Sequence, residues 1–378
     1  MAASPVLAPW VVLEDSVDLV ERPVEREQEW SAIRCASKKA YGCGEHGQQL
    51  VEGLTLLARV GSPDPVASLR IRVEDQALKI IRAEFNAGDE PLVSIAVGGI
   101  FAKAAIWQAG DSFIVLSMEF QFGVYGERVY YLVYDAVARS LAMIPPLPKH
   151  RVSYRAMTPV PVRGGGNDYQ LVHLASLMRR EQEVPGIPLY DDTLCVWTPA
   201  APPPAEPAWP HIAPWRRKER RFPAGHVRDP DMLFEHVSFS FKGQAFWADL
   251  SQGVVGCDLR AAGLSDVVDC DFIGLPPGHP FDIAADMDLK PATMFRTICA
   301  AGDSIKYVSI DYTGDIAERM VAVWTLHLDQ KRWTQDGGAF SVRSLWGLEG
   351  FRRAGLQEME PKCPFLTPDG ASWWPTSA

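Results

Sequence analysis

Four aspartates in the second half of the chain come closest, by type and spacing, to an active site. Asp249, Asp258, Asp269 and Asp271 each follow or flank a segment with strand character. Two carboxylates about 5 to 10 Å apart can carry out glycoside hydrolysis. Aspartate at a strand end is also a common turn former, because its side chain bonds nearby backbone. A carboxylate-dependent hydrolase is therefore the alternative prediction, and no catalytic residue is assigned.

A metal site is suggested most closely by Cys35, Cys43 and His46. A structural zinc site takes four such ligands, and no second pair completes the set. The sequence also lacks the G-x-x-x-x-G-K-[ST], H-E-x-x-H and G-x-S-x-G motifs of phosphate, zinc and acyl chemistry. We expect no metal, no cofactor and no enzymatic activity.

One short run could recognise negative charge or direct nuclear import. Its basic residues are Arg216, Arg217, Lys218, Arg220 and Arg221. A solvated loop or a hairpin edge protected by its charges is the interpretation we favour, and a nuclear regulatory protein is a further alternative. The chain as a whole has a net charge of −10. Because phosphate binding needs clustered Lys and Arg, we do not expect a nucleic-acid partner.

Cellular location is indicated by cysteine usage and by the apolar segments. Seven scattered cysteines fit a reducing compartment better than a disulfide framework. The longest uncharged apolar stretch, between Glu90 and Lys103, is shorter than the about 20 residues that a spanning helix needs. The first thirteen residues lack the basic start of a secretory signal. We expect a cytoplasmic and/or nuclear protein with no membrane contact.

The elements that would position these residues repeat along the chain. The turn Ala-Gly-Asp-Ser occurs at 109–112 and again at 301–304, each time before a strand-like segment. Weaker copies at 166–168 and 242–244 place the four turns at intervals of 57, 76 and 59 residues. Glycine beside aspartate suits tight hairpins. The spacing predicts antiparallel units, each too small to bury a core alone.

Strand signals dominate between these turns. In residues 236–241 apolar and serine positions alternate, the pattern of a half-buried strand, and residues 236–259 predict a three-stranded meander. Residues 168–183 could form a helix, but their place in the repeat favours a strand for the first half. Residues 342–353 are expected to contain a helical turn.

These patterns predict an all-β fold, a β-propeller-like array of about six antiparallel blades. A β-sandwich or two packed β-domains is the alternative. The expected domains are an N-terminal β region (1–105), repeat blades (106–198), a Pro-rich and basic insertion (199–221) and C-terminal blades (222–378). Large aromatics such as Trp197, Trp247 and Trp324 are expected to pack between blades.

The C-terminal segments resemble a known family. Residues 247–260, 271–278, 294–311, 323–333 and 345–351 are together similar to the plant family called domain of unknown function 1618, which is expanded in grasses. The resemblance implies a β-propeller-like fold and brings no catalytic residues with it. The residues that carry this structural signature are Trp247, Asp249, Leu250, Gly253, Cys257, Asp258, Gly302, Asp303 and Trp324.

Together these observations predict a non-enzymatic module that binds an unidentified protein partner through loops or one rim of the fold. A large exposed apolar patch would favour this binding role. A convergent pair of carboxylates would favour the hydrolase.

Overall fold

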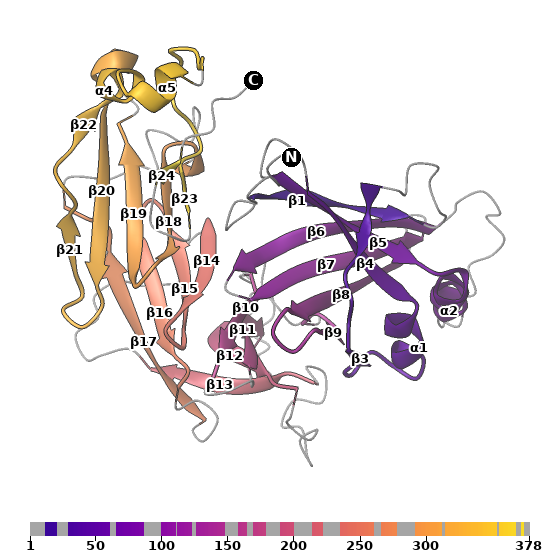
Figure 1. Cartoon of the computed structure of the whole chain (residues 1–378). Coiled ribbons are helices and arrows are strands. Elements are labelled where there is room, and N and C mark those ends of the chain that lie inside the picture. Colours follow the sequence, from indigo (N-terminus) through magenta and orange to yellow (C-terminus); the bar gives the residue numbers. More distant parts are fainter. Residues whose placement is uncertain are drawn as a thin grey trace. The chain divides into compact units, whose positions relative to one another are not determined.

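The computed structural model describes residues 12–20, 29–60, 66–86, 100–110, 112–122, 126–147, 158–164, 169–178, 190–199, 214–221, 235–260, 266–277, 292–311, 314–353, 355–367 and 372–373. The chain divides into two compact units. One consists of Met1–Asp191 with Cys195–Arg217, and the other of Asp192–Leu194 with Lys218–Ala378. Most of the described residues lie in strands, which confirms the all-β class (Figure 1).

The described part of the first unit alternates strands with two helices. In chain order the elements are β1 (Val12–Val20), β2 (Ser31–Ala32), β3 (Ser37–Ala40), α1 (Gly47–Glu52), β4 (Leu54–Val60), β5 (Val66–Val73), α2 (Asp75–Asn86), β6 (Ile100–Gly110), β7 (Phe113–Phe122), β8 (Gly126–Asp135), β9 (Ser140–Ile144), β10 (Val160–Arg163), β11 (Tyr169–Met178) and β12 (Tyr190–Trp197).

Nine of these strands form one wide sheet in the order β2-β4-β5-β1-β6-β7-β8-β9-β3. Most neighbours are antiparallel, but β1 runs parallel to β5 and β3 runs parallel to β9. Strands β10 and β11 are antiparallel neighbours in a second sheet, where β12 follows β11, and Val160 lies opposite Val172. Because β11 covers the first half of 168–183, the strand prediction for that segment is confirmed.

The central strands of the wide sheet are buried on both faces. Leu116 and Met118 of β7 lie in a core that also contains residues of α1 and α2. Phe113 and Val115 of the same strand lie in a second core with Trp197. Alternate residues of a strand point to opposite faces, so burial on both sides requires the continuous apolar runs seen in β7 and β8.

Both helices lie within residues 1–105, the segment predicted as an N-terminal β region. Helix α2 buries Ala77, Leu78 and Ile81, a spacing that places them on one helical face, and Asp75 lies in its first turn. This helix is not among the elements predicted from the sequence, although the apolar spacing is visible in residues 75–86. In the parts of the chain that the structure describes, no helix is both long and apolar enough to cross a membrane.

The second unit is built mainly from hairpins. Its described elements are β13 (Arg216–Arg221, which begins at the end of the first unit), β14 (Val237–Phe241), β15 (Gln244–Asp249), β16 (Gly253–Asp258), β17 (Val267–Gly274), η5 (Ala292–Met294), β18 (Arg296–Ala301), β19 (Ser304–Ile310), η6 (Ile316–Glu318), β20 (Met320–His327), β21 (Arg332–Gln335), β22 (Phe340–Ser341), α4 (Val342–Trp346), α5 (Glu349–Arg353), β23 (Phe365–Leu366) and β24 (Ser372–Trp373). The short helices α4 and α5 confirm the helical turn expected in residues 342–353.

Two sheets of the second unit share one hydrophobic core. Strands β14 to β17 contribute Phe246 and Val254, and strands β18 to β21 contribute Ile298 and Tyr307. A hydrogen bond of 2.7 Å from the indole of Trp333 to the carbonyl of Gly274 also joins the two sheets. Two sheets packed face to face over a common core form a sandwich.

The repeated turns are hairpins, as predicted. Gly110 faces Phe113 at the end of β6 and β7, and Ala301 faces Ser304 at the end of β18 and β19. Between β14 and β15 both turn residues, Lys242 and Gly243, have positive φ, the conformation of a two-residue type I′ turn. The copy at 166–168 falls between β10 and β11 and lies outside the described residues.

The propeller arrangement of these hairpins is not confirmed. Nine of the described strands of the first unit make one wide sheet rather than four-stranded blades, and the second unit has the two-sheet core of the alternative sandwich. Local turn signals predict hairpins but carry no information about pairings between distant segments. The parallel pairings of β1 with β5 and of β3 with β9 join segments that are distant in the sequence, so no turn signal could predict them.

Candidate interaction surface

Asp249, the most buried of the four candidate carboxylates, stabilises a turn. Its Oδ1 accepts a hydrogen bond of 2.8 Å from the backbone amide of Ser251, and its Oδ2 accepts one of 3.0 Å from the side chain of Gln252. The Ser251 hydroxyl also donates to Oδ1. These bonds fix the turn between β15 and β16, so Asp249 has the turn-forming role.

The other three candidate carboxylates lie at the surface, each paired with a different cation. The pairs are Asp258–Arg260, Asp269–Arg221 and Asp271–Lys331. The hydrogen bond from Arg260, with its charge, lowers the pKa of Asp258 below its usual range. Among the described contacts, none joins two of the four aspartates as an acid and base pair.

The family signature has a structural explanation at several positions. Trp247 and Leu250 are buried in the second unit. A side chain at Gly253 would collide with the carbonyl oxygen of Ile273, so close strand packing requires glycine there. Gly302 has φ of 57° in the β18–β19 hairpin, where glycine avoids strain.

The remaining signature residues are also structural. Asp303 uses its backbone carbonyl to accept a hydrogen bond of 3.0 Å from Lys242. Trp324 packs, half buried, against the shared core of the second unit, and Trp247 is almost fully buried. Packing in a core is confirmed for these aromatics, although the predicted packing between blades is not.

The basic run is a strand, which corrects the favoured interpretation of a loop or hairpin edge. Strand β13 pairs in parallel with β17, with Arg220 opposite Val268, and in the sheet order it stands between β12 and β17. Lys218 is buried, and its carbonyl accepts a hydrogen bond of 2.8 Å from the Thr193 hydroxyl. The strand was not predicted because a run of charged residues usually indicates an exposed loop. Long basic side chains can nevertheless bury their apolar stems and occupy a strand.

The two cysteines considered for metal binding contact different backbone carbonyls, Cys35 that of Ile33 and Cys43 that of Met143. Cys43 is buried and its thiol lies 3.4 Å from the carbonyl of Met143, while Cys35 is half buried. Within the described ranges, no group of three or more metal-ligating side chains comes together. Burial raises the pKa of Cys195 and of Cys299 to about 12, so both are protonated thiols rather than nucleophiles at neutral pH.

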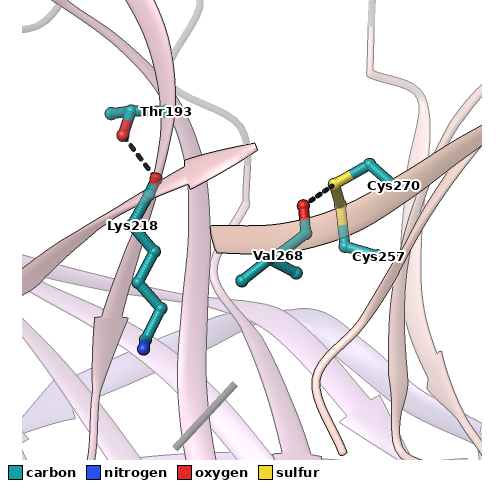
Figure 2. Close-up of a disulfide and its surroundings, with 5 residues drawn as sticks. All are labelled: Thr193, Lys218, Cys257, Val268 and Cys270. Atoms are coloured by element: carbon teal, nitrogen blue, oxygen red, sulfur yellow. Dashed lines mark hydrogen bonds between the residues drawn. A yellow bond between two sulfur atoms is a disulfide. The ribbon is translucent and has the colours of Figure 1, made fainter. Parts of the chain in front are cut away.

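Sequence reasoning missed a disulfide. Cys257 of β16 and Cys270 of β17 are directly opposite each other in the antiparallel ladder and are joined, with their Cα atoms 4.2 Å apart (Figure 2). The sequence alone favours a reducing compartment over a disulfide framework and assigns no cysteine pair. The signal was available only once β16 and β17 were in register, because cysteine count alone cannot show which strands face each other.

The described residues also expose apolar side chains at one end of the second unit. Ile316 of η6, Met320 at the start of β20, and Leu348 and Leu356 around α5 have exposed fractions between 37% and 56%. We call these four residues the C-terminal apolar patch. Figure 1 shows α4 and α5, in yellow, at the end of the sheet where β20 begins.

Local contacts bring the segments of the C-terminal apolar patch together. The amide of Val342 at the start of α4 donates a hydrogen bond of 2.9 Å to the carbonyl of Arg319, which follows η6. Arg343 of α4 forms an ion pair with Glu318 of η6. Sequence reasoning missed the patch because single apolar residues among polar ones give no recognisable periodicity.

The fold and the patch define an all-β protein with a sandwich-like second unit that carries exposed apolar side chains at one end. Residues 247–372 match the family model described as "Protein of unknown function (DUF1618)", the family that the C-terminal segments were expected to resemble. The match contains both the disulfide and the C-terminal apolar patch. A comparison with curated proteins finds no match.

Proposed function

We propose that the protein is a non-enzymatic binding module that docks another protein on the C-terminal apolar patch. The observation that carries this proposal is that Ile316, Met320, Leu348 and Leu356 are all exposed. They lie on or beside segments that the Val342–Arg319 hydrogen bond and the Arg343–Glu318 ion pair hold together. Exposed apolar residues with a polar border are characteristic of protein-binding surfaces.

The border of the patch consists of exposed ion pairs. Arg343 pairs with Glu318, and Arg353 pairs with Glu349 one helical turn away. All four side chains are more than half exposed, so these pairs contribute little to stability. Their charges cancel locally, which suits a partner with an apolar contact surface better than a polyanion.

The hydrolase has no comparable observation in its favour. Asp249 is engaged in a turn, and the other candidate aspartates are engaged in ion pairs. The nuclear regulatory role would need the basic run to be accessible as a whole, whereas in strand β13 Lys218 is buried and Arg216 and Arg221 are exposed. Cytoplasmic or nuclear location and plant origin stay predictions from the sequence.

Affinity capture with matched variants tests the proposal. We expect a partner retained by the wild-type protein to be reduced at least about tenfold by Met320→Asp combined with Leu348→Asp, since a few central apolar residues dominate most interfaces. The control, Val60→Asp combined with Val137→Asp, changes equally exposed residues of the first unit and should retain the partner. Equal retention by both double variants would refute the proposed docking surface.

A further inference from the structure

The Cys257–Cys270 disulfide lies where strand β17 changes its pairing. Residues 270–274 of β17 pair with β16, and Cys270 is the first of them. Residues 267–269 have their described pairing with β13 instead, where Glu219 faces Val267 and Arg221 faces Asp269. The disulfide therefore marks the end of the β16–β17 ladder, next to the segment that holds β13.

Several weaker contacts hold β13 in place beyond this point. The amide of Glu219 donates a hydrogen bond of 2.7 Å to the carbonyl of Asp266, and Arg221 forms an exposed ion pair with Asp269. Figure 2 shows the Thr193 hydroxyl bonded to the Lys218 carbonyl near the disulfide. An exposed ion pair is weak, and strand ends open more readily than strand centres.

We propose that Cys257–Cys270 is a redox latch that holds the start of β17, and with it the basic strand β13, in the sheet. The bond closes a loop with a sequence separation of 13 and ties β17 to β16, two strands of the hydrophobic core. With the bond intact, residues 267–269 cannot separate from the sheet without moving a covalently fixed neighbour. Without it, that end of the ladder opens at lower cost, and β13 loses β17, one of its two neighbouring strands.

The chemistry of the latch requires a dithiol reductant. A thiolate of the reductant attacks one sulfur, forms a mixed disulfide and releases the other cysteine, which takes up a proton. The second thiol of the reductant then displaces the first cysteine, so the protein gains two thiols and the reductant leaves as a disulfide. Both cysteines are at most 2% exposed, so the reductant gains access when the ladder end opens.

The Val268 carbonyl lies 3.9 Å from the Cys270 sulfur (Figure 2). A disulfide sulfur has no proton to donate, so this approach becomes an S–H···O contact only in the reduced protein. Val268 is also the residue opposite Arg220 of β13. Reduction thus changes the bonding of the segment of β17 on which β13 rests. The latch is separate from the C-terminal apolar patch and does not depend on the proposed function.

Hydrogen exchange with thiol counting tests the latch. Denatured, unreduced protein should show five free thiols, because two of the seven cysteines are joined. After reduction with dithiothreitol, amides in residues 216–221 and 266–269 should exchange at least about tenfold faster, while those of β19 stay unchanged. The variant Cys257→Ser/Cys270→Ser should show the fast pattern without reductant.

The control variant Cys195→Ser/Cys299→Ser removes two free thiols and should respond to reductant as the wild type does. Seven free thiols in protein purified under air would overturn the latch. Unchanged exchange in β13 after confirmed reduction would do so as well. Loss of protection throughout β19 in the reduced wild type would also overturn it and would make the bond a staple of the whole unit.

Discussion

At the scale of single residues, the buried His173 side chain packs in the core of the first unit. His173 is fully enclosed among aromatic rings, with its Nε2 atom 3.4 Å from the Tyr131 hydroxyl and its ring centroid 5.8 Å from that of Trp215. Burial lowers the pKa of His173 to about 4, so the imidazole is neutral at pH 7. Its protonation therefore opposes folding.

The free energy of unfolding should depend on pH through His173. The folded-state pKa of about 4 lies below the unfolded value of 6.5, so the unfolded state binds more protons between these values. Stability from this group is complete above pH 6.5 and falls by about 3 kcal/mol as pH drops to 4. Denaturant unfolding of the wild type and His173→Gln at several pH values measures this. Parallel pH profiles would rule out the contribution.

Gly253 offers a second residue-scale prediction, with a control on the opposite strand. Gly253→Ala places a methyl group against the Ile273 carbonyl and should lower the free energy of unfolding by about 1 to 3 kcal/mol. Gly274 is its cross-strand neighbour, and a methyl group there meets nothing within 4 Å. Gly274→Ala should change stability by less than about 0.5 kcal/mol. Equal melting temperatures for the two variants would contradict the packing argument.

For single residues, the sequence predicted the roles that depend on hydrogen bonds to residues nearby in the chain. Asp249 was correctly weighed as a turn former, because an aspartate and its turn lie together in the chain. The Cys257–Cys270 bond and the reason for Gly253 could not be predicted, since both depend on which residues of β17 lie opposite β16. That register follows from packing of the completed sheet.

At the scale of elements, hairpins were predictable and wide sheets were not. Each confirmed hairpin, such as β18–β19, is coded by a short turn with residues suited to it. The parallel pairing of β3 with β9 brings together segments about a hundred residues apart, with Ser37 opposite Ser140. Such pairings leave no turn signal, so repeated hairpins in sequence are compatible with blades, sandwiches and wide sheets.

Helix α2 should be held by its buried face rather than by helix propensity. Ile81 is fully buried in the first core, and Ile81→Ala should cost about 2 to 5 kcal/mol of unfolding free energy. Lys79 is exposed on the same helix, and Lys79→Ala should change stability by less than about 0.5 kcal/mol. Chemical denaturation monitored by circular dichroism compares them. A near-neutral Ile81→Ala would mean that α2 does not pack as described.

At the scale of the whole molecule, the chain consists of two compact units with different features. The first unit has buried aromatic and helical cores, and the second carries the family match, the disulfide and the C-terminal apolar patch. The sequence predicted a binding role from the lack of catalytic motifs. The proposed docking surface could not be predicted from composition, because its residues are dispersed from Ile316 to Leu356.

The most direct test of the central claim is a hydrogen-exchange footprint of the protein with its captured partner. We expect slower exchange in residues 316–320 and 345–356 on binding, with no change in β4 or at the β8–β9 turn, where the control residues Val60 and Val137 lie. Protection confined to other parts of the molecule, with the C-terminal apolar patch exchanging as in the free protein, would contradict it.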